Sequence, residues 1–178
     1  TLRAWKRATA VIERERGAFY ARQFENPDNP EAHRLSTARE ILSEIPGGQV
    51  DAVASGVGTG GTIVGLHEGF RENGCDSVPV AARPVSGALC EVECCSFGSS
   101  LDSGSSSGAR FSSRVPGVME GISRLYRPEA MDGLIQVDVP DEDALRTTRD
   151  LIARGFPVGP SSGLNFAAAL EAARRLGP

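Results

Sequence analysis

The sequence contains a single lysine, Lys6, so arginine carries almost all of its positive charge. Its 178 residues have a net charge of −4, and no basic cluster is accompanied by aromatic residues, which argues against nucleic-acid binding. No apolar run approaches the roughly 20 residues needed to cross a bilayer, and the first residues are too charged for a secretion signal. These absences predict a cytoplasmic protein without nucleic-acid or membrane partners.

Cysteine and histidine are also scarce. The cysteines are Cys75, Cys90, Cys94 and Cys95. They are too few and too irregularly spaced for a disulfide framework in a chain of this length. No second cysteine pair or nearby histidine completes a metal site, so we expect no bound metal. His33 and His67 each stand alone on a predicted helix, where a structural or surface role is favoured over catalysis.

Hydrophobic periodicity divides the chain into helices and strands, which indicates an α/β protein. Helices are expected at residues 2–16, 31–44, 62–72, 141–154 and 164–176, and strands at 18–24, 50–55, 78–82 and 134–139. The strand, helix, strand order over residues 50–82 predicts a parallel sheet. Residues 84–113 are rich in serine and glycine and form a predicted irregular insertion in an otherwise single domain spanning 1–178.

The most informative stretch is the glycine-rich loop Gly56-Val57-Gly58-Thr59-Gly60-Gly61-Thr62, which follows a predicted strand and opens a predicted helix. Such a turn directs free backbone N–H groups at one small volume, where the helix dipole also favours negative charge. Glycine permits close approach and unusual dihedral angles. The hydroxyls of Thr59 and Thr62 can add two donors. The loop therefore predicts phosphate binding, although a tight turn without a ligand is the simpler alternative.

The same loop satisfies G-x-G-x-x-G through Gly56, Gly58 and Gly61, a pattern found in dinucleotide sites. An acidic residue should then end the next strand, but that strand is followed by Arg83, which would suit only a phosphorylated dinucleotide. The pattern also normally follows the first strand of its domain, whereas several predicted elements precede it here. Dinucleotide binding is therefore the second interpretation.

Three stretches together resemble one enzyme family. They are Gln23-Phe24-Glu25-Asn26-Pro27-Asp28-Asn29-Pro30-Glu31-Ala32-His33, the loop Gly56 to Thr62, and Gly159-Pro160-Ser161-Ser162-Gly163. Their order and separation are similar to those of the cysteine synthase (O-acetylserine sulfhydrylase) branch of the fold-type II pyridoxal-phosphate enzymes. The resemblance covers most of the chain except residues 84–113. It implies an incomplete tryptophan synthase β-like fold, with three layers and a mostly parallel sheet flanked by helices.

The resemblance also implies how the cofactor, pyridoxal 5'-phosphate, is held. The residues that would bind its phosphate are Gly58, Thr59, Gly60, Gly61 and Thr62. Ser161 would face the pyridine nitrogen. A neutral hydroxyl does not keep this nitrogen protonated, so the ring is a weaker electron sink than one paired with a carboxylate. Without the family, Ser161 or Ser162 is simply an N-cap for the last helix.

For the substrate, the resemblance implies that Gln23 helps to bind the carboxylate, the alternative being a solvated polar strand end. The segment Arg114 to Gly121 occupies the place of the family's active-site roof, but Pro116 and Met119 depart from the family pattern. Arg83 departs as well, since relatives commonly carry a glutamate before the proline. These departures concern the side from which the second substrate enters, so acceptor specificity stays open.

The implied reaction is β-replacement on an activated serine such as O-acetylserine, with sulfur transfer to form cysteine, in an enzyme that is a homodimer when complete. Alternatives are a lyase resembling cystathionine β-synthase or serine/threonine dehydratase, and a non-catalytic phosphate-binding or dinucleotide-binding module. The family's Schiff-base lysine has no counterpart, because Lys6 lies downstream of where that lysine belongs. We therefore assign no catalytic residue, and expect the chain to be an inactive part of a longer enzyme.

Overall fold

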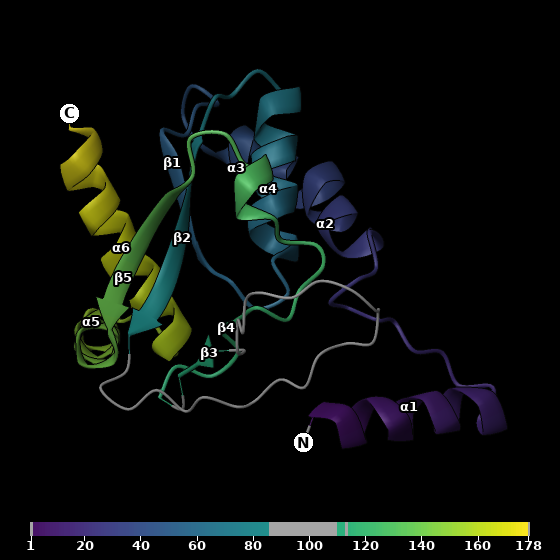
Figure 1. The fold of residues 1–178 in the computed structure, drawn as a ribbon. Coiled ribbons are helices and arrows are strands. Elements are labelled where there is room, and N and C mark those ends of the chain that lie inside the picture. The colour runs from purple at the N-terminus through teal and green to yellow at the C-terminus, as the bar shows by residue number, and fades with distance from the viewer. Residues whose placement is uncertain (1, 86–109, 113, 178) are drawn as a thin grey trace.

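The computed structural model describes residues 2–85, 110–112 and 114–177 (Figure 1). The helical elements are α1 (Leu2–Arg16), α2 (Asp28–Ala32), the π-helical turn η1 (His33–Thr37), α3 (Ala38–Glu44), α4 (Gly61–Glu72), the 3-10 turn η2 (Pro128–Ala130), α5 (Asp141–Ala153) and α6 (Pro160–Leu176). The strands are β1 (Ala52–Gly56), β2 (Val78–Val85), β3 (Arg110–Phe111), β4 (Met119–Glu120) and β5 (Ile135–Pro140). No helix within the described ranges combines the length and apolar character that a membrane span requires.

The centre of the fold is a parallel sheet in the order β1-β2-β5. Ala52 lies opposite Val78, and Val80 lies opposite Ile135, which fixes the register of the strands. Helices α5 and α6 cover one face, and α4 covers the other, with α2, η1 and α3 packed against α4 (Figure 1). The predicted three-layer α/β arrangement is confirmed, and β3 and β4 add only a short antiparallel pair.

Alternation along the strands decides which side chains face which helix layer. The residues that face α6 form the larger core cluster: Val80, Ala82, Val137 and Val139 from the sheet, with Leu164, Ala168 and Ala172 from α6. On the opposite face, Ala81 packs with Ile63 of α4 and with Val57 and Met131. The glycine-rich loop is therefore anchored at one side by Val57, which is buried in this second cluster.

Several predicted elements differ from the structure: β2 continues to Val85, α6 begins at Pro160, and larger differences occur before residue 45. Residues 18–24 do not form a strand, because a strand needs a hydrogen-bonded neighbour and none of the described strands pairs with them. They end instead in a turn in which the N–H groups of Glu25 and Asn26 donate to Arg22 O. The helix expected at 31–44 begins at Asp28, since Asn26 Oδ1 accepts a hydrogen bond of 3.0 Å from the Asp28 N–H.

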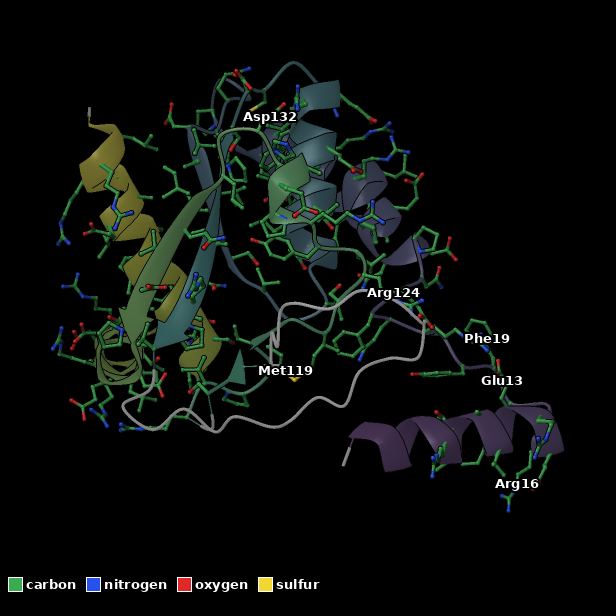
Figure 2. The ribbon with its side chains drawn as sticks, in the orientation of Figure 1. Glu13, Arg16, Phe19, Met119, Arg124 and Asp132 are labelled. Carbon is green, nitrogen blue, oxygen red and sulfur yellow. The ribbon has the colours of Figure 1, made fainter. Side chains whose placement is uncertain are left out.

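Helix α1 has the predicted bounds and ends before Gly17, whose φ is +62°. It lies apart from the α/β body, and the segment that joins them carries Phe19, which is 87% exposed (Figures 1 and 2). The predicted insertion at residues 84–113 lies outside the described residues except at its two ends. Cys90, Cys94 and Cys95 also lie outside the described residues.

Candidate functional site

The glycine-rich loop joins the carboxyl end of β1 to the first turn of α4. Gly60 is the N-cap of α4 in the left-handed conformation, with φ of +80°, and as a glycine it has no side chain to cap the helix. Within the described residues, the backbone N–H groups of Gly58, Thr59, Gly60 and Thr62 form no hydrogen bond. Such unpartnered donors at the positive end of a 12-residue helix suit an anion with several acceptor oxygens, such as a phosphate group.

Neighbouring segments pack tightly against the glycines of the loop. A Cβ added at Gly60 would lie 2.5 Å from Tyr126 Cβ, and one added at Gly58 would overlap the carbonyl of Gly117. A Cβ at Gly61 would overlap the side-chain amide of Asn29. Glycine is therefore required here by the close approach of α2 and of the segment that contains Gly117 and Tyr126, which together fix the path of the loop.

Asn29 of α2 connects the loop to the turn that contains Gln23. Its Nδ2 donates hydrogen bonds to Gln23 O at 2.7 Å and to Thr59 Oγ1 at 3.0 Å. Thr59 Oγ1 also accepts a bond of 3.3 Å from the Gly61 N–H. Through Asn29 the structure brings Gln23, whose side chain is exposed, close to the glycine-rich loop, although Thr59 follows Asn29 by 30 residues in sequence. Asn29 belongs to the motif Gln23 to His33, but its residue type and position alone assign it no role.

The segment from Arg114 to Tyr126 crosses the loop from the other side. The Met119 N–H donates to Val57 O at 2.8 Å, and Ser123 Oγ makes a short hydrogen bond to Thr59 O. The Arg124 N–H donates to Phe24 O at 2.9 Å, which ties the same segment to the turn beside Gln23. Figure 2 labels Met119 and Arg124 along this path. The segment that the family resemblance places over the active site therefore contacts the loop directly.

His33 lies closer to the loop than the sequence analysis indicated. Its Nε2 is 3.2 Å from Thr62 Oγ1, and its Nδ1 is 3.1 Å from Thr37 Oγ1. The tautomer of His33 decides whether Thr62 donates or accepts in this pair. The available signal is its position at the end of the motif Gln23 to His33, which the fold brings against the start of α4.

The two helices on this side of the sheet are held together by Arg34. Its guanidinium contacts the carboxylates of Glu31 and Glu72, each at 2.6 Å. The hydrogen bond from Arg34 lowers the pKa of Glu31, and the same two carboxylates raise the pKa of Arg34. These ion pairs join η1 to α2 and to the last turn of α4, and because both carboxylates are about half exposed their contribution to stability is small.

Ser161 lies in the first turn of α6 at the same edge of the sheet. The helix begins at Pro160, its N-cap is Gly159, and no side chain caps it. The N-cap interpretation of Ser161 or Ser162 is therefore wrong, because proline takes the first helical position and moves both serines inside the helix. One turn later, Asn165 Oδ1 accepts a hydrogen bond of 2.7 Å from the Gly56 N–H, which joins α6 to the start of the loop.

A cavity of about 280 Å³ adjoins the loop, lined by Val57, Met119, Tyr126 and Arg83 among others. Arg83 is bound to its neighbours across the sheet, with Nε 3.1 Å from Asp138 Oδ1 and Nη1 2.8 Å from Gln136 Oε1. Its charge is therefore engaged by a cross-strand partner, which does not favour the dinucleotide interpretation. In the described parts of the chain, no group of three His, Cys, Asp or Glu residues is arranged to bind a metal.

Comparison with known proteins identifies the class. Residues 2–178 match the family model described as "Pyridoxal-phosphate dependent enzyme", and the chain belongs to this family. Pyridoxal 5'-phosphate is accordingly its cofactor, and the unpartnered donors at the start of α4 fit the phosphate of that group.

More particularly, the chain is similar to cysteine synthases. It is 36% identical over 177 residues to "Probable cysteine synthase" of Bacillus subtilis, covering 97% of this chain and 51% of that relative. It is 36% identical to "Cysteine synthase 2" of Schizosaccharomyces pombe, covering 90% of this chain and 41% of that relative. The chain thus spans about half the length of the curated relatives it matches.

Solved structures agree with this placement. An O-acetylserine sulfhydrylase from Entamoeba histolytica superposes with a TM-score of 0.72 at 27% identity, covering 96% of this chain and 46% of that structure. A hydrogen sulfide-producing enzyme from Fusobacterium nucleatum superposes with a TM-score of 0.73 at 26% identity, covering 97% and 53%. The resemblance to fold-type II pyridoxal-phosphate enzymes is therefore confirmed.

Proposed function

We propose that this chain is the cofactor-phosphate-binding part of an enzyme that performs β-replacement on an activated serine, with sulfur transfer to form cysteine. The observation that carries the proposal is the set of unpartnered N–H groups between β1 and α4, in a chain whose relatives include cysteine synthases. The likeness covers about half of those relatives, so the activity is proposed for the complete polypeptide.

In this proposal the phosphate is bound by Gly58, Thr59, Gly60, Gly61 and Thr62. The backbone donates most of the hydrogen bonds, and the positive end of α4 adds a favourable field. The loop is held in place before the ligand arrives, since Asn29, Ser123 and the Met119 N–H each bond to it. Such a cradle needs little rearrangement to bind an anion, which favours affinity.

The remaining contacts orient the reacting parts. When bound, pyridoxal phosphate supplies an electron-withdrawing ring that eases removal of a proton from the substrate's α-carbon. Ser161, at the start of α6, offers a neutral hydroxyl to the ring nitrogen and does not hold a proton there. Gln23, exposed beside the loop, binds the substrate carboxylate. Ser161 in the first turn of α6 and the Gln23 backbone, linked to the loop through Asn29, lie at or beside the carboxyl edge of the sheet, where α/β proteins commonly bind their ligands.

The chain does not supply the amine that bonds to the cofactor aldehyde. Its one lysine, Lys6, lies on α1, apart from the loop (Figure 1). Arginine cannot substitute, because its guanidinium stays protonated and is a poor nucleophile. We therefore assign the amine to another part of the complete polypeptide, and expect no turnover from these 178 residues alone.

The test uses the complete polypeptide, loaded with pyridoxal phosphate and assayed for products. Cysteine formed from O-acetylserine and sulfide supports the proposal. Cystathionine formed with homocysteine, or pyruvate formed from serine, would assign the enzyme to another branch of the family. If the complete polypeptide takes up no pyridoxal phosphate, as judged by absorbance after gel filtration, the phosphate-loop assignment is wrong.

A further inference from the structure

The side-chain amide of Asn29 can be oriented without ambiguity. Its hydrogen bond to the Gln23 carbonyl, at 2.7 Å, ends on an oxygen that can only accept, so the amide must present its NH2 group there. The same nitrogen is 3.0 Å from Thr59 Oγ1. An NH2 group has two hydrogens and no free lone pair, so Asn29 donates one hydrogen to each partner, and Thr59 Oγ1 is the acceptor.

The hydroxyl of Thr59 then has one hydrogen-bonding capacity left. A threonine hydroxyl has two lone pairs and one hydrogen. One lone pair accepts from Asn29 Nδ2, and the other accepts from the Gly61 N–H at 3.3 Å, which is also a donor only. The hydroxyl hydrogen finds no acceptor among the described residues. Thr59 is therefore poised to donate its hydrogen, and not to accept.

We infer that Asn29 is a positioning residue that makes Thr59 an obligate hydrogen-bond donor to the cofactor phosphate. The inference rests on the proposed function, in which Thr59 is one of the phosphate-binding residues. The free N–H groups of the loop and the Thr59 hydroxyl then all donate, which matches the acceptor-only oxygens of a fully ionised phosphate. Because Asn29 also binds the Gln23 carbonyl, one side chain sets both the loop and the turn beside it.

The experiment measures equilibrium binding of two probes, pyridoxal 5'-phosphate and pyridoxal, which lacks the phosphate. The polypeptide that carries this chain is compared as wild type, Asn29→Leu, Thr59→Val and the double variant. Thr59→Val deletes a hydrogen bond to a charged group and should weaken pyridoxal phosphate binding about 10-fold or more. Asn29→Leu leaves the hydroxyl present but free to rotate, so the expected loss is about 3- to 10-fold.

The double variant decides the matter. If Asn29 acts through Thr59, the double variant binds pyridoxal phosphate within about twofold of Thr59→Val alone. Pyridoxal binding should change by less than about twofold in all variants. Asn73→Leu is the matched control, since Asn73 Nδ2 also donates to a carbonyl, that of Gly69, at the far end of α4. It should leave both affinities unchanged.

Losses that multiply in the double variant, or that affect pyridoxal equally, would overturn the inference, because they indicate a general structural role for Asn29. Circular dichroism and thermal melting establish that each variant folds. If Asn29→Leu does not fold, Asn29→Asp replaces it: the carboxylate accepts the Thr59 hydrogen, and binding should weaken more than about 10-fold. A wild-type protein that binds no pyridoxal phosphate contradicts the proposed function, whereas wild-type binding with unchanged Asn29 variants contradicts only this inference.

Discussion

Replacing Gly60 by alanine tests whether the chain closes over the phosphate loop as the structure has it. A Cβ at Gly60 would have φ of +80° and would lie 2.5 Å from Tyr126 Cβ. Gly74 is a matched control, because its φ is +74° and an added Cβ would meet nothing within 4 Å. The left-handed backbone costs any residue with a Cβ about 1–2 kcal/mol, and this cost is common to both sites. Only Gly60 adds the overlap with Tyr126, about 1–3 kcal/mol.

Urea unfolding of the two variants and the wild type measures these terms. Gly74→Ala should lower the free energy of unfolding by about 1–2 kcal/mol and Gly60→Ala by about 2–5 kcal/mol, with unchanged m-values. Gly60→Ala should also weaken pyridoxal phosphate binding, since the N–H groups of the loop are displaced, whereas Gly74→Ala should not. Equal losses of stability in the two variants would refute the contact between Tyr126 and the loop. Equal affinities would refute the role of the loop in binding.

Two further substitutions follow from buried groups. His67 is 6% exposed and neither ring nitrogen has a hydrogen-bond partner among the described residues, so His67→Leu should raise the free energy of unfolding by about 1–3 kcal/mol. Burial, and to a smaller extent the nearby charge of Arg71, lowers the pKa of His67. The unfolded chain therefore binds a proton more readily than the folded one, and the wild type should lose stability as the pH falls below about 6.5. In urea titrations at several pH values, His67→Leu should remove this dependence of the free energy of unfolding on pH. Gly163→Ala would drive a Cβ into Thr148 Oγ1 of α5 and should destabilise by about 3 kcal/mol or more. A Cβ at Gly159 meets nothing within 4 Å, so Gly159→Ala should cost only the N-cap preference for glycine, less than about 1 kcal/mol.

Sequence reasoning succeeded where local chemistry decides the outcome. The glycine-rich loop and the bounds of α1, α4 and α5 follow from periodicity and from glycine positions, and the structure agrees within a residue or two. It failed where the outcome depends on a distant partner. Residues 18–24 have strand composition but no strand beside them, and Asn29 has no local signal that it will meet Thr59. The N-cap prediction for Ser161 failed because Pro160 occupies the first helical position and makes Gly159 the N-cap.

Three helices begin at the carboxyl edge of the sheet, and their first turns differ in charge. This difference explains why the proposed site binds the phosphate at α4 and the ring nitrogen at α6. Helix α5 carries Asp141, Glu142 and Asp143 in its first turn, which neutralise its positive end. Helices α4 and α6 have no acidic residue in the first turn and no capping side chain. An anion is therefore favoured at α4, where the loop adds N–H donors. If the ring nitrogen lies at Ser161 as proposed, the positive field at the start of α6 disfavours its protonation, in the same direction as the neutral hydroxyl.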